Sequence, residues 1–232
     1  MDFAIPSILS ERLKNGLADV GNVPVIEYAR QKLELIPGAG VACHGPVRSI
    51  LLVSKRPPGE IRTLAADTSS RTSVELCRIL LSKKYRVEPE VRRHAPDLQA
   101  MLRDCDAALV IGDPALRIDP ARVGRRVLDL VEEWVEHTGL PMVFAVRAGA
   151  ARHVTPEVQA DLLGSVRYGR EHLEDVIARE SAARNFDVEL ARRYLSSHIV
   201  NELGPRDYEG LRAYLRAAAE LGALTQDEPV LH

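Results

Sequence analysis

The stretch TSSRTSVELCRILL, residues 68–81, decides how this chain is interpreted, because it joins a strand-like run to a helix-like run. Five of its first six residues carry a hydroxyl group. The first turn of a helix leaves backbone N–H groups free, and such a start binds carboxylates and phosphates. Thr72 and Glu75 have the spacing of a capping box, so we predict a helix over residues 72–84 with an anion site at its start.

Two interpretations of these hydroxyls stay open. A helix cap needs only one hydroxyl, so the spare ones are either surface groups or ligand contacts. The stretch lacks the glycines and the lysine of a P-loop, which favours a carboxylate over a nucleotide phosphate. Arg71 either pairs with the carboxylate of a ligand or ties to a neighbouring acidic side chain.

The composition excludes several classes of function. The chain has 232 residues and a net charge of -2, which gives no general attraction to nucleic acid or to a membrane. Aromatic residues make up only 4%, which argues against base stacking as a binding mode. The three cysteines have no metal-ligand spacing, and Cys77 and Cys105 are predicted to be buried thiols. No run is long and apolar enough to span a membrane and no signal-peptide pattern is visible, so we expect a cytoplasmic protein.

Strand-like and helix-like runs alternate along the chain before a helical tail, which is the order typical of an α/β fold. The predicted strands lie at residues 18–25, 47–53, 61–66, 107–111 and 142–146. The predicted helices begin at residues 6, 72 and 97, and those of the tail cover residues 156–163, 165–183, 187–198 and 207–221. The run 107–111 is apolar throughout, as expected of a buried parallel strand.

Two chain breaks, KRPPG at residues 55–59 and TGLP at residues 138–141, enclose a segment with its own strands and helices. We therefore predict two lobes with a cleft between them. Residues 1–57 and 140–232 form the first lobe, and residues 58–139 form the second. Ligands of open α/β sheets bind at the carboxyl ends of the strands. Both TSSRTS and the loop Gly112-Asp113-Pro114 follow strands of the second lobe, so we expect them to face one ligand in the cleft.

Few other residues have the pattern of catalytic machinery. Asp113 is either a general base or a loop aspartate that accepts backbone N–H groups. His44 is interpreted as a structural residue and Trp134 as a packing residue. The sequence contains no histidine pair with metal-ligand spacing, no nucleophile elbow and no Ser-His-Asp order.

Several segments together resemble one family, the chorismate dehydratases of the futalosine route to menaquinone. They are LKNGLADVGNVPVIEYAR, GPVRSILLVSK, DTSSRTSVELCRILL, CDAALVIGDPAL and EEWVEHTGLPMVFAV, in this order. The resemblance implies a two-lobed fold of the type II periplasmic-binding-protein kind with a helical C-terminal tail. It also implies a hydro-lyase that converts chorismate to 3-[(1-carboxyvinyl)oxy]benzoate without a metal or redox cofactor. The resemblance allows the enolpyruvyl carboxylate of the substrate to act as the base that removes the C3 proton from the same molecule.

The resemblance also implies the residues of the site. Ser69, Ser70, Arg71, Thr72 and Ser73 are expected to bind a substrate carboxylate, and Ser70 is the candidate catalytic residue.

The loop at residues 45–49 is expected to supply donors from the other lobe, at Gly45 and Val47. Asp113 and Thr138 are expected to border the cleft. Chorismate is the expected partner, and whether the protein is a monomer or a homodimer stays open.

Two departures from the family stand out. The family usually has a further N-terminal strand, followed by an S-Y-L-N loop, and this sequence starts after that segment. The family also often has tryptophan at the position of Arg147. Two alternative functions are a non-catalytic solute-binding-like protein for an aromatic carboxylate and the related 1,4-dihydroxy-6-naphthoate synthase.

Overall fold

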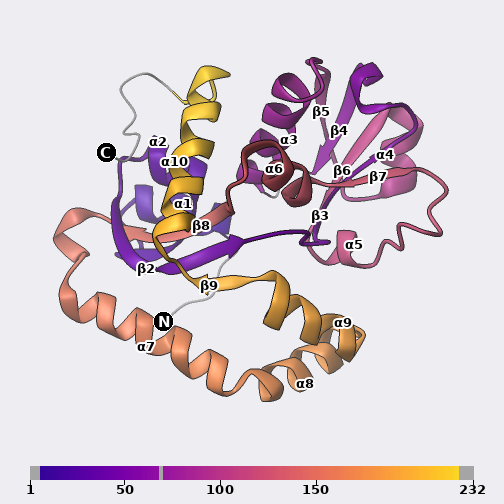
Figure 1. The fold of residues 1–232 in the computed structure, drawn as a ribbon. Helices are drawn as coiled ribbons and strands as arrows, with labels where there is room; N and C mark the ends of the chain where they lie inside the picture. The colour runs from indigo at the N-terminus through magenta and orange to yellow at the C-terminus, as the bar shows by residue number, and fades with distance from the viewer. Residues whose placement is uncertain (1–5, 68–69, 225–232) are drawn as a thin grey trace.

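A computed structural model describes residues 6–67 and 70–224, whose strands form two β-sheets (Figure 1). The first sheet has the order β1-β8-β2-β9, and the second has the order β5-β4-β6-β3-β7. The strands are β1 (Val20–Pro24), β2 (Glu34–Cys43), β3 (Ile50–Ser54), β4 (Thr63–Asp67), β5 (Glu90–His94), β6 (Ala107–Ile111), β7 (Arg126–Asp129), β8 (Met142–Gly149) and β9 (Val200–Glu202). With the helices around them, these sheets confirm the α/β class that the sequence predicts.

The helices cover both faces of both sheets. They are α1 (Pro6–Lys14), α2 (Val25–Arg30), α3 (Arg71–Lys83), α4 (Leu98–Asp104), α5 (Asp113–Leu116), α6 (Leu130–Thr138), α7 (Pro156–Glu171), α8 (Leu173–Arg184), α9 (Val188–Arg193) and α10 (Pro205–Glu220). Short turns of 3-10 helix lie at Pro58–Glu60 and Ala151–His153, and a π-helix lies at Tyr194–His198. None of the helices in the described residues is both long and apolar enough to cross a membrane.

The inner strands of the second sheet, β4, β6 and β3, are buried on both faces. Ile50 and Leu52 of β3 join the large core with α3 and α6, whereas Leu51 and Val53 join a smaller cluster with α4 and α5. Successive side chains of a strand point to opposite faces, so a strand covered on both sides must be apolar throughout. The same explanation holds for β6, although β6 is parallel only to β4 and antiparallel to β3.

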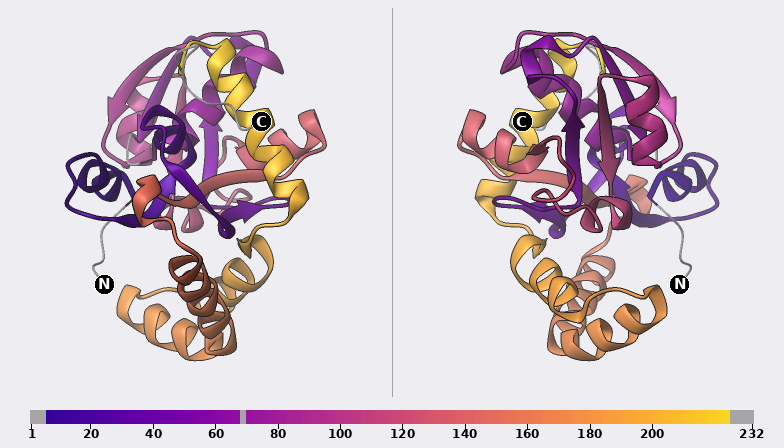
Figure 2. Two further views of the ribbon diagram at one scale, coloured as in Figure 1. Left: turned by 90° about the vertical axis from the view of Figure 1, so that its left-hand side faces the viewer. Right: turned by 90° about the vertical axis from the view of Figure 1, so that its right-hand side faces the viewer.

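The first sheet has α1, α2 and α10 on one side and an arm of three helices, α7 to α9, on the other (Figure 1). Figure 2 shows this arm as a separate layer that projects from the body of the molecule. The arm leaves the sheet at the end of β8 and returns to it through β9, which pairs with β2. The arm therefore begins and ends on the first sheet.

The first crossing between the sheets differs from the predicted boundary at residue 57. β3 forms ladders with β6 and β7, so residues 50–54 belong to the second sheet. The chain crosses at residues 44–49, between β2 and β3. The proline-rich break at Pro57 begins a short 3-10 turn between β3 and β4, so this break lies within the second lobe. The chain returns to the first sheet between α6 and β8.

Four strands, β2, β5, β7 and β9, match none of the strands predicted from the sequence. β5 reads EVRRH and four of its five residues are exposed, so it lacks the apolar alternation of a typical strand. β9 has only three residues, and it shows that the tail after residue 155 is not purely helical.

β1 lies at one edge of the first sheet. It pairs with β8 over its whole length, from Val20 opposite Gly149 to Pro24 opposite Ala145. Within the described chain, β1 has no strand on its other side.

The contact between α10 and the start of β8 gives the first prediction. A side chain at Gly210 would place its Cβ 2.1 Å from the carbonyl oxygen of Pro141. We expect Gly210→Ala to lower the free energy of unfolding by about 1–3 kcal/mol, because backbone must move to admit the methyl group. Gly164→Ala in α7 is the matched control, since nothing lies within 4 Å of its added Cβ. That variant should gain about 0.5–1 kcal/mol in chemical denaturation, and equal effects of the two changes would refute the packing argument.

Candidate functional site

The start of α3 is capped by Ser70, and not by Thr72 as the capping-box spacing predicts. Ser70 has extended backbone angles, as a capping residue requires, and its hydroxyl accepts the N–H of Ser73 at 3.3 Å. The two serine hydroxyls lie 2.9 Å apart. Thr72 is already helical, and Glu75 binds Arg78 at 2.8 Å. If Ser73 donates to Ser70, the proton of Ser70 is free to bind a ligand.

The next two hydroxyls of the motif are buried, and that of Thr72 contacts the first lobe. Thr72 Oγ1 donates to the carbonyl of Phe144 in β8 at 3.4 Å, and Tyr214 of α10 donates to the carbonyl of Thr72 at 3.1 Å. Thr72 and Ser73 are each only 1% exposed. Among the residues of TSSRTS that the structure describes, Ser70 therefore has the most accessible hydroxyl. Ser69, the other predicted serine, lies outside the described residues.

Arg71 binds a neighbouring acid, one of the two roles left open by the sequence. Its Nη1 lies 2.8 Å from Oε1 of Glu27, which α2 supplies from the first lobe. Burial of Glu27 favours its neutral form, but hydrogen bonds from Arg71 and Arg30 outweigh burial and hold the pKa of Glu27 below its ordinary value. The pair joins the two lobes at the start of α3.

The crossing loop uses its predicted donors within the protein. The backbone N–H groups of Val47 and Arg48 donate to Oδ2 of Asp129 at 2.8 and 2.6 Å. The other oxygen of Asp129 accepts the N–H groups of Val131 and Glu132 at the start of α6. Burial raises the pKa of Asp129, and the four backbone donors oppose that shift.

Gly45, in the same loop, is half-buried and has open space where a side chain would begin. The neighbouring His44 binds Asp207 at 2.8 Å, and Asp207 in turn accepts the N–H of Gly204 ahead of α10. These contacts support the structural role that the sequence suggests for His44.

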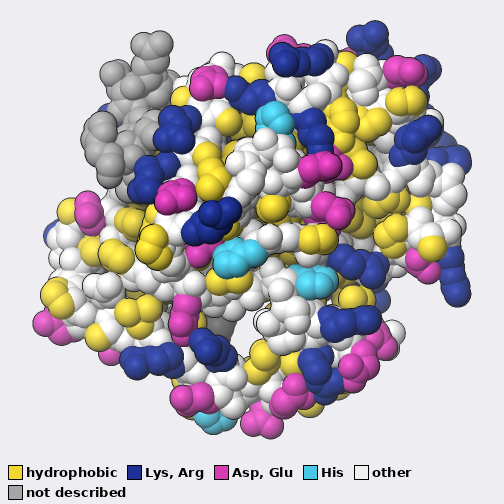
Figure 3. Space-filling model, in the orientation of Figure 1, with side chains coloured by type: hydrophobic (Ala, Val, Ile, Leu, Met, Phe, Trp, Pro, Cys, Tyr) yellow, Lys and Arg dark blue, Asp and Glu magenta, His cyan; other side chains and the backbone are white. Residues whose placement is uncertain are grey.

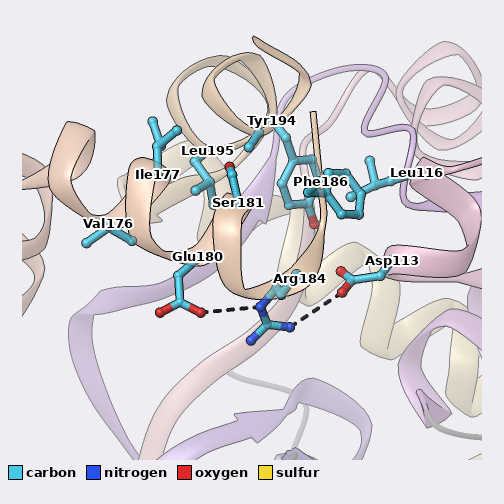
Figure 4. A pocket seen from close by; sticks show the side chains of 11 residues that line it. Asp113, Leu116, Val176, Ile177, Glu180, Ser181, Arg184, Phe186, Tyr194 and Leu195 are labelled. Atoms are coloured by element: carbon cyan, nitrogen blue, oxygen red, sulfur yellow. Dashed lines mark hydrogen bonds and ion pairs between the residues drawn. The ribbon is translucent and has the colours of Figure 1, made fainter. Parts of the chain in front are cut away.

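Asp113 begins α5 and lies beside a pocket of about 260 Å³ between α5 and the arm (Figure 4). Its Oδ2 is 3.4 Å from Nη1 of Arg184, which also binds Glu180 at 3.3 Å. The walls are largely apolar and include Leu116 and Phe186. Among the described residues, no backbone N–H donates a hydrogen bond to the carboxylate of Asp113. The structure therefore does not show the loop aspartate, accepting backbone N–H groups, that was one of its two predicted roles.

Thr138 lies away from Ser70, contrary to its predicted place beside the cleft. It ends α6, where its hydroxyl donates to the carbonyl of Trp134 at 2.8 Å and accepts the N–H of Leu140 at 3.1 Å. Thr138 shares a hollow with Ile79 and Lys83, in the last turns of α3, whereas Ser70 caps the first turn. A helix of this length separates its two ends by about 20 Å. The packing role of Trp134 is confirmed, since it is 1% exposed and bonds the carbonyl of Pro141.

Tyr194 and His198 of the arm were missed by the sequence analysis. Tyr194 donates to the hydroxyl of Ser49 in the crossing loop at 3.1 Å, and its ring meets that of His198 edge to face. Nδ1 of His198 is buried without a hydrogen-bond partner. Both residues belong to a π-helix, a form that often marks functional sites, but no sequence signal announces it.

The described residues offer little for a metal or a reactive thiol. No three of their His, Cys, Asp and Glu side chains come together as metal ligands. Cys77 and Cys105 are buried free thiols, as predicted, and burial raises the pKa of Cys77 to about 12.

The four donors on Asp129 give a prediction for stability. Asp129→Asn should lower the free energy of unfolding by about 2–4 kcal/mol, because an amide cannot accept all four N–H groups and turns a donor toward some of them. Asp187→Asn is the control, since Asp187 caps only α9 through the N–H of Leu190. Urea denaturation checks both variants, and a loss no larger at Asp129 than at Asp187 would contradict the role given to the crossing-loop donors.

The Glu27–Arg71 pair gives a prediction for pH. A depressed carboxyl pKa adds stability above the pKa of the unfolded chain, and this stability is lost as the pH falls through the folded value. Arg71 is 45% exposed as a side chain, so solvent screens the pair, and Arg71→Met should cost about 0.5–1 kcal/mol at pH 7. The difference from wild type should shrink as the pH falls through the lowered pKa of Glu27, where this carboxylate becomes protonated in the folded protein. In a Glu27→Gln background the same change should be nearly neutral, and a cost independent of Glu27 would argue against the pair.

Comparison with known proteins places this geometry in context. The chain is 29% identical to a chorismate dehydratase of Thermus thermophilus over 232 residues, covering 92% of this chain and 84% of that protein. It is 25% identical to a chorismate dehydratase of Campylobacter jejuni over 221 residues, covering 94% of this chain and 82% of the relative.

Solved structures show the same fold. A crystal structure of a protein from Archaeoglobus fulgidus matches with a TM-score of 0.73 and 21% identity, over 96% of this chain and 86% of that one. The periplasmic aliphatic sulphonate binding protein of Escherichia coli matches with a TM-score of 0.64 and 15% identity, over 98% and 82%. The two-lobed, periplasmic-binding-protein-like fold implied by the sequence is thereby confirmed.

A family described as menaquinone biosynthesis matches residues 3–220. This range includes both sheets, the crossing loop, the start of α3 and the arm. The chain belongs to this menaquinone biosynthesis family.

Proposed function

We propose that this protein is a hydro-lyase that dehydrates chorismate to 3-[(1-carboxyvinyl)oxy]benzoate. Two relatives named chorismate dehydratase, similar over most of the chain, support the substrate. The observation that carries the site is the accessible hydroxyl of Ser70 at a helix start packed between the lobes.

The proposed reaction needs few acid–base side chains from the protein. Chorismate loses the proton of C3 and the hydroxyl of C4 as water, and its ring becomes aromatic. The substrate's enolpyruvyl carboxylate takes the proton. The C1 carboxylate is conjugated with the ring and takes up charge as the bonds break, so donors that hold it stabilise the transition state. The protein's main tasks are then to hold one conformer of the substrate and to exclude water.

Ser70 fits the role of carboxylate donor better than its neighbours in the motif. Its hydroxyl accepts the cap bond from Ser73 and keeps its own proton for a ligand when Ser73 donates to it. Thr72 and Ser73 support this arrangement from beneath, since both are buried and bonded within the protein. In this proposal Arg71 stays with Glu27 and positions the first turn of α3, and does not bind substrate.

A binding module is the rival function, since the sulphonate-binding protein shares the fold. The two functions differ in the fate of chorismate. An enzyme releases an aromatic product whose ultraviolet absorption and NMR signals differ from those of chorismate, whereas a binding protein leaves chorismate unchanged. Incubation of the purified protein with chorismate, followed by proton NMR without added cofactor, decides between them. Unchanged chorismate in a folded sample would refute the proposed reaction.

Ser70→Ala should reduce kcat/KM by roughly 10- to 100-fold, the loss of one hydrogen bond to a charged group at about 1.5–3 kcal/mol. The variant also loses a helix cap, which needs its own control. Asp97→Ala removes the cap of α4, on the other face of the second sheet, where Asp97 accepts the N–H of Ala100 at 3.0 Å. The control should lose similar stability and keep its activity. Unaltered kinetics in Ser70→Ala would leave that serine with a capping role alone.

A further inference from the structure

Arg147 and Asn22 face each other on the first sheet with polar atoms that have no partner. Arg147 of β8 lies opposite Asn22 of β1 on one side and opposite Ile36 of β2 on the other. The Nε of Arg147 and the Oδ1 of Asn22 are both buried without a hydrogen bond. Directly opposed side chains of an antiparallel pair share a face and have Cβ atoms about 5 Å apart. The two side chains that carry these unpartnered atoms are therefore neighbours.

These side chains point to the side of the sheet where the arm lies. A Cβ on Gly21 would meet Leu9 of α1, and Val23 joins the main core together with Val146, its partner in β8. Asn22 and Arg147, each next in sequence to one of these residues, point to the opposite face. On that face α7 approaches β2, since a Cβ on Gly38 would lie 3.0 Å from Leu163. Figure 3 shows an opening between the arm and the body of the molecule.

The charge of Arg147 is uncompensated in the part of the chain that the structure describes. No acidic side chain there forms an ion pair with it, and burial alone lowers its pKa. An arginine remains protonated even when burial disfavours its charge, so the cost is borne by the folded protein. A bond between Arg147 and Asn22 would satisfy the two atoms but would leave the positive charge unpaired. Arg147 is half-buried with its Nε fully buried, and a charge placed in this way is normally met by an anion.

We propose that Arg147 and Asn22 form a binding site for a carboxylate on the arm side of the first sheet. The guanidinium presents its donors to a carboxylate in a fixed fork, and the amide of Asn22 supplies one further donor or acceptor beside it. The start of α3 follows β4 of the second sheet, whereas Arg147 and Asn22 lie on strands of the first sheet. The carboxylate belongs either to chorismate, which carries two, or to a separate aromatic acid.

Three variants test the site by thermal unfolding, with benzoate and chorismate as probes. Arg147→Met should unfold at a higher temperature than wild type in the absence of ligand, because an apolar side chain replaces an unpaired charge. The same variant should lose the stabilisation that carboxylates give wild type, with at least a tenfold weaker Kd. Asn22→Ala should weaken binding less. Arg167→Met is the matched control, since it removes the same charge from an exposed position of α7 and should behave as wild type.

A binding residue is distinguished from a structural one by two results for Arg147→Met. Its unfolding temperature rises without ligand, and its stabilisation by carboxylates is lost. A lower unfolding temperature for Arg147→Met without ligand, or unchanged affinity for both probes, would overturn the inference. Wild type that gains no stability from either carboxylate would overturn it as well.

Kinetics with chorismate identify the source of the carboxylate. If the carboxylate belongs to the substrate, Arg147→Met raises KM; if it belongs to a separate acid, KM is unchanged while benzoate affinity falls. Either kinetic result, together with the lost stabilisation, supports the site. The carboxylate site and the proposed reaction can each be disproved without the other. A wild-type protein that leaves chorismate unchanged but is stabilised by benzoate through Arg147 would disprove the reaction and keep the site.

Discussion

The carboxylate of Asp129 is the constraint on which the relation between the two sheets depends. One of its oxygens holds two N–H groups of the crossing loop, and the other holds two N–H groups at the start of α6. The loop leads into β3, an inner strand of the second sheet, and α6 leads back to β8, an inner strand of the first. A single buried side chain thus fixes where the chain enters the second lobe and where the helix that leaves it begins.

The hydroxyl-rich motif divides its work between structure and chemistry. Arg71 and Thr72 tie α3 to α2 and β8 of the first lobe, and Tyr214 adds a bond from α10. These contacts hold the first turn of the helix against the other lobe. Ser70 is then held in place by its bonds to Ser73 while keeping some exposure to solvent. A rigid support beneath one accessible donor suits a site that must hold a substrate in one conformer.

Sequence patterns predicted the elements whose signals are local. The apolar run of β6 and the cap of α4 at Asp97 depend only on neighbouring residues, and both were found. Signals that depend on distant partners misled or were absent. A proline-rich break such as that at Pro57 is typical both of a turn within a lobe and of a boundary between lobes. Only the pairing of β3 with β6 shows that this break is a turn. The family resemblance led us to expect Thr138 beside the cleft, but its hydroxyl donates to the carbonyl of Trp134 in its own helix. Arg147 looked like a departure from a family pattern, and only the sheet register brought Asn22 beside it.

The position of β8 has a consequence for how the polypeptide is made. β8 is an inner strand of the first sheet and pairs with β1 and β2, yet residues 44–141 separate it from the end of β2. A chain emerging from the ribosome exposes β1 and β2 long before their common partner exists. The second lobe is complete in sequence by then and is able to fold by itself first, since domains generally fold as units during synthesis. The first lobe must wait, and its early strands are the segments that most need protection from aggregation in the nascent chain.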